Sequence, residues 1–175
     1  MLNASQLRAM EVNDLQQIWA WRNSERIRNA MIGNHVISWE EHCHWFDKQQ
    51  RDETSTYFVY EQEGRPVGVV NFTHIHREHL TCYWGFYLGE DGLPKGTGTM
   101  MGKLALQYAF EHLGIRKVCA EVLGDNIASK NFHIKLGFRQ EGVLKEHIWK
   151  KGAFIDLVCF ALFRDDYLKE ARMLD

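Results

Sequence analysis

A pair of glycines followed at once by an amphipathic segment is the feature of this chain that most suggests chemistry. The stretch GLPKGTGTMMGKLALQYAF, residues 92–110, places two glycines, spaced GxG, just before a helical pattern. A backbone without side chains can approach phosphate oxygens closely, and the first amides and the dipole of a helix favour negative charge. Taken alone, this spacing is also typical of a tight turn. We expect a pyrophosphate group to be held by Lys95, Gly96, Thr97, Gly98 and Thr99.

Two other glycine motifs for phosphate do not fit this stretch. A P-loop needs a glycine five residues before its Gly-Lys pair and Ser or Thr after it, whereas Thr97 and Leu104 stand at those positions. A dinucleotide fingerprint needs GxGxxG, but the three glycines here are spaced GxGxxxG and the chain offers a single crossover unit. The remaining interpretation is a cofactor that carries a pyrophosphate.

Histidines and cysteines suggest two further kinds of chemistry. The histidines at 74 and 76 are spaced to share one face of a strand, but no cysteine or carboxylate completes a ligand set, so we expect no metal. The four cysteines form no CxxC pair and lie in apolar stretches such as KVCAEV, which is typical of reduced, buried thiols. They are Cys43, Cys82, Cys119 and Cys159.

The elements that must position these residues follow from periodicity. The first quarter of the chain reads as helical, with a capping box at Ser38 and Glu41. A hairpin, an aromatic strand, the helix after the glycines, a short strand and a helix capped by Asn126 come next. A second hairpin and a last helix close the chain. This order predicts an α/β or α+β fold with one parallel crossover, formed by residues 1–175 as a single domain.

Composition excludes several classes of function. The 175 residues are 45% apolar, which suits one globular domain, and the net charge of −2 gives no electrostatic footprint for nucleic acid. The chain has no apolar run long enough to span a membrane and no signal peptide pattern at its start. We therefore expect a cytoplasmic protein without nucleic-acid or membrane partners.

Three segments together resemble the GNAT superfamily of N-acetyltransferases. They are the glycine loop, the strand KVCAEVL and the helix NIASKNFHIKLGF. The family's coenzyme A motif is Gln or Arg, two residues, Gly, any residue, then Gly or Ala; Leu93 replaces the first side chain, which leaves the backbone cradle intact. The resemblance implies a mixed, mostly antiparallel central sheet with a splayed parallel pair, flanked by helices. It also implies acetyl-CoA as the co-substrate and no metal.

The resemblance assigns further residues to the cofactor and to catalysis. The exposed edge of the splayed strand would offer amide donors near Tyr87 and Leu88 to the pantetheine arm. His133 stands where the family often has a tyrosine general acid, although a pocket role for it, with water or a nearby tyrosine as the acid, has equal weight. On the same helix, the resemblance implies cofactor contacts for Asn126, Ser129, Phe132 and Lys135.

The acceptor is inferred from a finer resemblance. Much of the chain is similar to the enzymes that acetylate UDP-4-amino-4,6-dideoxy-N-acetyl-β-L-altrosamine in pseudaminic acid biosynthesis, which implies a nucleotide-sugar substrate. Two arginines could meet its diphosphate and three aromatic residues could stack on uracil, although such residues are often simply solvated or in the core. The acceptor candidates are Arg22, Arg28, Trp45, Thr73, Tyr83 and Trp84.

Three points stay open. The first candidate for the general base is His74, with Glu90, a relay through Thr73, or an ordered water as alternatives. The alternative function is a ribosomal-protein-type N-terminal acetyltransferase that acts on a peptide amine. Exposed strand edges permit a homodimer as well as a monomer.

Overall fold

The computed structural model, which describes residues 4–172, contains one seven-stranded sheet in the order β1-β2-β3-β4-β5-β7-β6. Neighbouring strands run antiparallel except β4 and β5, which are parallel. The predicted mixed, mostly antiparallel sheet with one parallel pair is confirmed. The strands are β1 (Ser5–Ala9), β2 (Thr56–Gln62), β3 (Arg65–His76), β4 (Thr81–Leu88), β5 (Lys117–Leu123), β6 (Arg139–Lys150) and β7 (Ala153–Phe163).

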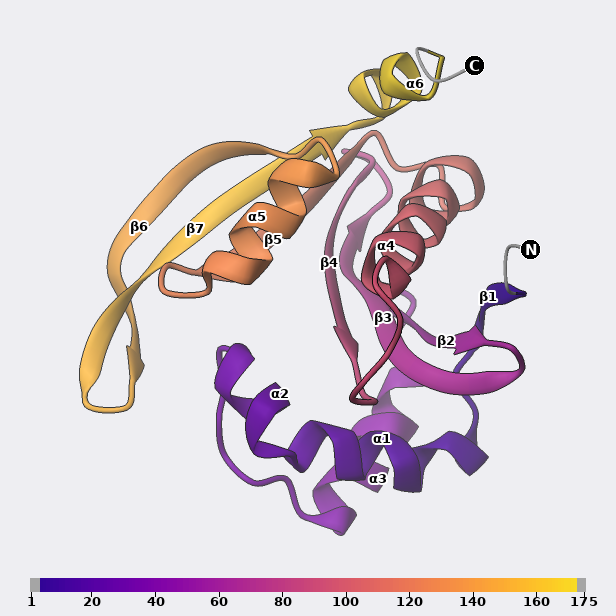
Figure 1. Ribbon diagram of the computed structural model, residues 1–175, viewed down its shortest axis with the longest axis vertical. Coiled ribbons are helices and arrows are strands. Elements are labelled where there is room, and N and C mark those ends of the chain that lie inside the picture. The colour runs from indigo at the N-terminus through magenta and orange to yellow at the C-terminus, as the bar shows by residue number, and fades with distance from the viewer. Residues whose placement is uncertain (1–3, 173–175) are drawn as a thin grey trace.

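Helices cover both faces of the sheet (Figure 1). The first three pack on one face, where Val59 and Val69 belong to their apolar cluster, while α4 and α5 pack on the other, where Phe72 and Val70 belong to the main core. Because side chains alternate along a strand, adjacent residues of β2 and β3 supply both layers. The helices are α1 (Leu15–Asn23), α2 (Glu25–Ala30), α3 (Trp39–Gln49), α4 (Thr97–Gln107), α5 (Ile127–Lys135) and α6 (Arg164–Arg172), with short turns η1 (Val12–Asp14) and η2 (Tyr108–His112).

The parallel pair separates soon after it forms. Only residues 81–83 of β4 pair with residues 117–119 of β5, and beyond Tyr83 the two strands have no further register. The rest of β4 therefore pairs with β3 alone, and its other edge is left without a strand partner. Backbone amides and carbonyls on such an edge are available to a ligand.

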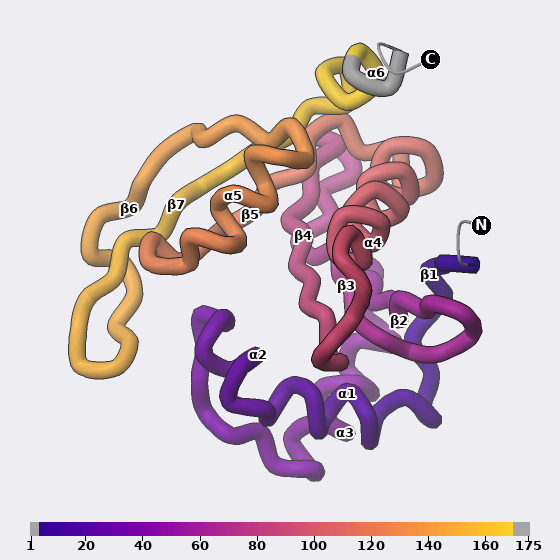
Figure 2. Tube along the Cα trace, viewed as in Figure 1, coloured from indigo at the N-terminus to yellow at the C-terminus, as the bar shows by residue number. Residues whose placement is uncertain are grey.

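The hairpin of β6 and β7 extends past α5 toward the end of α2 (Figure 2). Its turn lies at Lys151 and Gly152, which both have positive φ, of 50° and 80°. Positive φ at both central residues matches the twist of a two-residue hairpin turn. The predicted Lys-Gly turn is confirmed, and the long hairpin brings distant residues to the N-terminal helices.

The sequence-based prediction is wrong at the start of the chain. The first quarter was expected to be helical, but Ser5–Ala9 form β1, which pairs with β2. Arg8 holds this edge strand in place, because its guanidinium binds Asp14 at 2.7 Å and Glu61 at 2.6 Å. Five residues with no strong alternation carry too little local signal; the partner strand lies some fifty residues away.

The cysteines meet the expectation only in part. All four are free, but only Cys82 is fully buried, and burial raises the pKa of its thiol to about 12. The other three are half-buried. Within residues 4–172, no group of three or more His, Cys, Asp or Glu side chains could hold a metal ion. None of the described helices is long and apolar enough to cross a membrane.

Candidate active site

A cavity of about 990 Å³ opens where β4 leaves β5. Residues of β4 and β5 form its floor, α2 borders it on one side, and α5 and the first turn of α4 border it on the other. We call this cavity the cleft. Twelve residues singled out from the sequence line it: Arg22, Thr73, His74, Tyr83, Trp84, Tyr87, Leu88, Gly98, Asn126, Ser129, Phe132 and His133.

The glycine loop forms an anion cradle at the start of α4. Gly96 caps the helix in the left-handed conformation, with φ of 94°, which favours glycine. Among the described residues, the backbone amides of Gly98 and Thr99 have no hydrogen-bond partner. The ammonium of Lys135 lies beside them and donates to Thr99 Oγ1 at 3.1 Å. Free amides, a helix dipole and a cation together suit a pyrophosphate.

Two members of the predicted cradle have other positions. Thr97 is buried, and its hydroxyl donates to Pro94 O at 2.8 Å, so it stabilises the turn. Lys95 is exposed on the loop before the helix. Neither Thr97 nor Lys95 lines the cleft. The free amides of Gly98 and Thr99 are the candidate groups for binding an anion.

Helix α5 lies against α4 and carries the other side of the cradle. Asn126 caps it, because its Oδ1 accepts the amide of Ser129 at 3.0 Å. Gly102 lets the helices approach, since a Cβ there would lie 2.8 Å from Leu136 Cδ1 and 3.0 Å from Phe132 Cζ. Asn126 is thus the residue that starts the helix, while Ser129 and Phe132 line the cleft.

Arg22 is the cation whose partner is missing. Its Nη1 atom is fully buried and makes no hydrogen bond to any described residue. Burial lowers the pKa of the Arg22 guanidinium, and the nearby Tyr87 opposes that effect. Arg26, which also borders the cleft, is occupied: it donates to Leu88 O and Gly89 O at 3.1 and 2.9 Å and pairs with Asp91.

His133 is buried within an aromatic cluster and has both ring nitrogens engaged. Its Nδ1 lies 2.8 Å from Ser129 O, and Trp84 Nε1 donates to its Nε2 at 3.2 Å. Because an indole N–H can only donate and a carbonyl can only accept, this network assigns the proton to Nδ1. Burial lowers the pKa of His133, which favours the neutral ring. This geometry favours a role in positioning Trp84 over donation of a proton.

The predicted base His74 and two predicted acceptor residues, Thr73 and Tyr83, lie together near the turn between β3 and β4. His74 lies in a bulge of β3, is exposed, and has φ of 49°. Its Nδ1 is 3.3 Å from Thr73 Oγ1, and its ring meets that of Tyr83 edge-on with centroids 5.7 Å apart. A base, a hydroxyl relay and a phenol therefore share one wall of the cleft.

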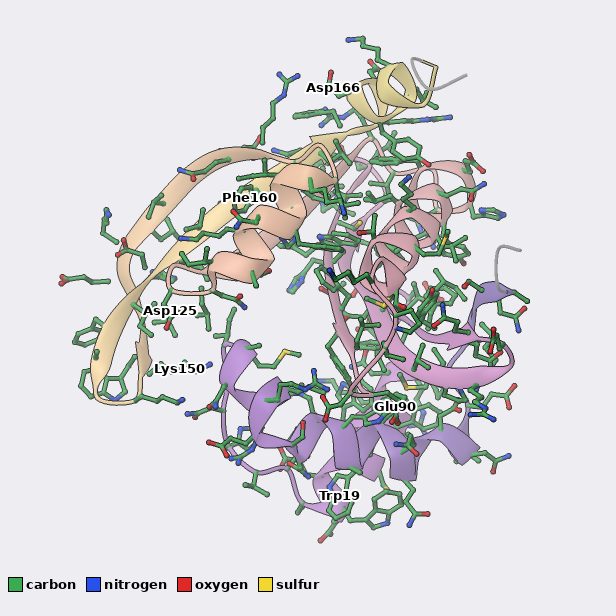
Figure 3. All side chains as sticks on the ribbon, in the orientation of Figure 1. Trp19, Glu90, Asp125, Lys150, Phe160 and Asp166 are labelled. Atoms are coloured by element: carbon green, nitrogen blue, oxygen red, sulfur yellow. The ribbon has the colours of Figure 1, made fainter. Side chains whose placement is uncertain are left out.

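Three other candidates do not line the cleft. The Arg28 guanidinium donates to Asn23 O and Asn34 O, which holds the loop after α2. Trp45 belongs to α3, and its ring contacts that of Tyr57 edge-on. Glu90 accepts the indole N–H of Trp21 at 2.9 Å. Figure 3 shows Glu90 beside α1. Arg28 and Glu90 thus serve the scaffold around the cleft.

The whole arrangement has known relatives. Residues 6–139 match the family profile described as acetyltransferase (GNAT) domain. The chain belongs to the GNAT acetyltransferase family. Spermidine N(1)-acetyltransferase of Escherichia coli K12 is 26% identical over 164 residues, 94% of this chain and 88% of that protein. Acetyltransferase PseH of Campylobacter jejuni strain 81-176 is 28% identical over 126 residues, 72% of this chain and 77% of that protein.

Solved structures agree on the fold of this acetyltransferase. Spermidine N-acetyltransferase from Vibrio cholerae, in complex with CoA and spermine, superposes with a TM-score of 0.89 at 24% identity. The superposition covers 94% of this chain and 98% of that one. A dodecameric structure of the Vibrio cholerae enzyme is among the similar structures. The expectation of a monomer or homodimer for this chain stays a prediction.

Acetyl-CoA is the co-substrate of this GNAT acetyltransferase. The residues present fit that molecule, because the amides of Gly98 and Thr99 are free and the Lys135 ammonium is adjacent. The free edge of β4 at Tyr87 and Leu88 would hold the pantetheine arm, although Arg26 already uses the Leu88 carbonyl. When bound, acetyl-CoA supplies an acetyl thioester.

Sequence reasoning missed Lys150, which ties the hairpin to α2. Its ammonium is buried and donates to Asn29 O at 2.9 Å, and also to Arg28 O and Met31 O. These carbonyls end α2, where a cation stabilises the helix dipole. Figure 3 shows Lys150 pointing from the hairpin tip toward α2. In the sequence WKKG it reads as an ordinary turn lysine.

Replacing Lys150 with Met is expected to raise the KM for the amine acceptor about fivefold. Three carbonyls would lose their donor, and Ile27, Ala30 and Met31 of the cleft wall would be held less firmly. Steady-state kinetics with each substrate varied will show this, with the KM for acetyl-CoA unchanged. Lys151→Met, at the adjacent exposed lysine, is the matched control. An equal rise in both KM values would contradict the assignment.

The buried state of His133 predicts a pH dependence of stability. Above the ordinary pKa of 6.5 the ring is neutral both folded and unfolded. As the pH falls below that value the unfolded chain gains a proton that the buried ring resists, so stability is lost. In His133→Phe, the melting temperature should fall less steeply from about pH 7 to about pH 5.5 than in the parent chain. Some slope will remain, because burial also lowers the pKa of His42.

The control for this measurement is His44→Gln, at an exposed position. It should keep the parent slope. If His133→Phe also keeps the parent slope, the folded ring takes up a proton as readily as the unfolded one, and the argument against a general acid at this position is lost.

Proposed function

We propose that this acetyltransferase transfers an acetyl group to the 4-amino group of a UDP-amino sugar such as UDP-4-amino-4,6-dideoxy-N-acetyl-β-L-altrosamine. The observation that carries the proposal is the buried Nη1 atom of Arg22, which has no partner among the described residues. A buried guanidinium nitrogen without an acceptor is costly, and a diphosphate supplies the missing acceptor in a matching fork geometry.

The charges of the cleft favour an anionic acceptor over a cationic one. Arg22 and Arg26 both line the cleft, and among its described lining residues Glu121 is the one carboxylate. A polyamine carries several positive charges and needs several carboxylates nearby. The phosphates of a nucleotide sugar instead complement Arg22, since Arg26 is already paired with Asp91.

A polyamine is the second candidate acceptor. The observation that favours it is the similarity to spermidine N(1)-acetyltransferase, which extends over 94% of this chain. The similarity to acetyltransferase PseH covers 72% of the chain and supports the first candidate together with the resemblance seen in the sequence. The charge of the cleft favours the UDP-amino sugar over the polyamine. The residues that line a site determine its ligand more directly than the fold does.

Acetyl transfer forms a C–N bond, breaks a C–S bond and moves two protons. We assign His74 to the removal of the proton from the amine, since it is exposed in the cleft beside Thr73. The thiolate that leaves takes its proton from the Tyr83 hydroxyl or from water, because both nitrogens of His133 are engaged. The amides near Tyr87 and Leu88 are candidates to stabilise the oxyanion.

Replacing His74 with Ala is expected to lower kcat about tenfold, since water can partly replace an exposed base. His76→Ala, two residues along the strand and outside the cleft lining, is the control. If kcat is unchanged in His74→Ala, another group removes the proton.

Release of free CoA thiol tests the proposed acceptor. The full chain is incubated with acetyl-CoA and, separately, with a UDP-4-amino sugar, spermidine, and a peptide with a free N-terminus. We expect a kcat/KM for the UDP-amino sugar well above those for the other two. Turnover restricted to spermidine would establish the second candidate, and turnover restricted to the peptide would establish N-terminal acetylation; either result overturns the nucleotide-sugar proposal.

A further inference from the structure

A second, smaller cavity of about 340 Å³ lies between α1, α3 and the sheet. We call it the inner chamber. It shares Arg22, Gly85 and Tyr87 with the cleft, so the two spaces meet along β4. Its volume falls within the range of small-molecule sites, about 300 to 1,000 Å³. Nothing described above uses this space.

The chamber combines aromatic walls with one free amide. Trp45 and Tyr57 meet edge-on with centroids 5.0 Å apart, and His42 stacks on Trp45. The side chain of Asn71, on β3, lines the chamber and makes no hydrogen bond to any described residue. A side-chain amide has two donors and an acceptor, and the half-buried amide of Asn71 has both kinds of group available to a polar ligand in the chamber.

Gly85 is what keeps this amide in place. It lies opposite Asn71 on β4, and a Cβ there would come within 2.7 Å of Asn71 Oδ1. The side chain of Asn71 therefore lies over the glycine, at the junction of chamber and cleft. Arg22, with its unpartnered nitrogen, stands at the same junction.

We propose that the inner chamber is a subsite for a pyrimidine base. The inference rests on the proposed function, because it places the base, the phosphates and the amine of one acceptor in sequence. The Asn71 amide pairs with the adjacent N–H and carbonyl of uracil, and the ring lies against Trp45 and Tyr57. Arg22 then meets the phosphates at the junction, and the sugar amine extends into the cleft toward His74.

Binding of uridine monophosphate to the full chain, measured by calorimetry without acetyl-CoA, tests this subsite. We expect uridine monophosphate to bind and inorganic phosphate to bind at least about tenfold more weakly, since phosphate alone reaches only the arginine. Asn71→Leu should weaken uridine monophosphate binding about tenfold, because a buried hydrogen-bonding edge of the base would lose its partner. Trp45→Leu is a second variant that removes the aromatic wall and leaves the amide.

The controls separate this inference from the proposed function. Both variants must keep the parent affinity for acetyl-CoA, which shows that the fold and the cradle are intact. Equal binding of uridine monophosphate by parent and both variants, or phosphate binding as tight as the nucleotide, overturns the subsite. If the UDP-amino sugar is acetylated but these variants leave its KM unchanged, the subsite is wrong while the proposed function stands. If uridine monophosphate binds as expected but no UDP-amino sugar is acetylated, the subsite stands and the acceptor proposal fails.

Discussion

Replacing Gly98 with Glu is expected to weaken acetyl-CoA binding about 100-fold to 1000-fold. The free amides of Gly98 and Thr99 form the proposed pyrophosphate site, and a carboxylate placed among them would repel the anion. Two like charges about 4 Å apart near a protein surface repel by about 4 kcal/mol, and each 1.4 kcal/mol corresponds to a factor of about ten in affinity. Calorimetric titration with CoA, together with kcat/KM for acetyl-CoA, measures this effect.

Gly98→Ala is the matched control. An ideal Cβ at this position would lie 3.6 Å from Leu88 Cδ1 and 3.9 Å from Phe132 Cε2, which are ordinary contacts. The alanine variant should therefore bind CoA within about threefold of the parent, with a similar melting temperature. CoA affinity that is unaffected by the glutamate would show that the diphosphate binds elsewhere, and the cradle assignment would fall.

Replacing Arg22 with Met is expected to lower kcat/KM for the acceptor about 100-fold while leaving the KM for acetyl-CoA unchanged. A guanidinium that meets a phosphate in a desolvated site makes charge-assisted hydrogen bonds, which are about twice as strong as neutral ones. Methionine keeps much of the volume and the apolar stem, so the packing beside Tyr87 is preserved. Initial rates with the acceptor varied at saturating acetyl-CoA give the result.

Arg22→Met should lose activity toward the acceptor but should not lose stability. The free chain holds a buried Nη1 atom without a partner, and removing an unsatisfied buried cation is neutral or stabilising. We therefore expect the melting temperature of Arg22→Met, without ligand, to equal or exceed that of the parent. Arg22→Lys is the comparison, because it keeps the charge and loses the fork; it should recover only part of the activity. A large loss of stability in Arg22→Met would mean that the arginine is structural.

Much of the fold and the glycine loop could be predicted from residues that lie close together in the sequence. Gly96 and Gly98 before an amphipathic helix predict a turn with exposed amides, and Asn126 before NIASKNF predicts a capped helix; both are where expected. The hairpin turn at Lys151 and Gly152 is equally local. Such features depend on residues only a few positions apart, so the printed sequence contains their whole cause.

The candidate acceptor site was predicted less well, because identical residue types have different partners in three dimensions. Arg22 and Arg28 lie six residues apart in one helical region, yet the first is unpartnered in the cleft and the second holds backbone carbonyls of a loop. His133 aligns with a catalytic tyrosine of the family, but the indole of Trp84, forty-nine residues earlier, engages its Nε2. No spacing rule indicates either outcome.

Periodicity, caps and glycines act over short distances, so the sequence alone predicted an α/β or α+β fold with a glycine turn at the start of a helix. The acetyltransferase activity was implied by the resemblance of three segments to the GNAT superfamily. Only the tertiary structure decided which charges lack a partner, that Lys150 joins the last hairpin to α2, and that Asn71 lies over Gly85 beside an inner chamber. The physical reason is that burial and hydrogen bonding are properties of contacts between distant segments, and the register of β3 against β4 and the divergence of β4 from β5 set those contacts.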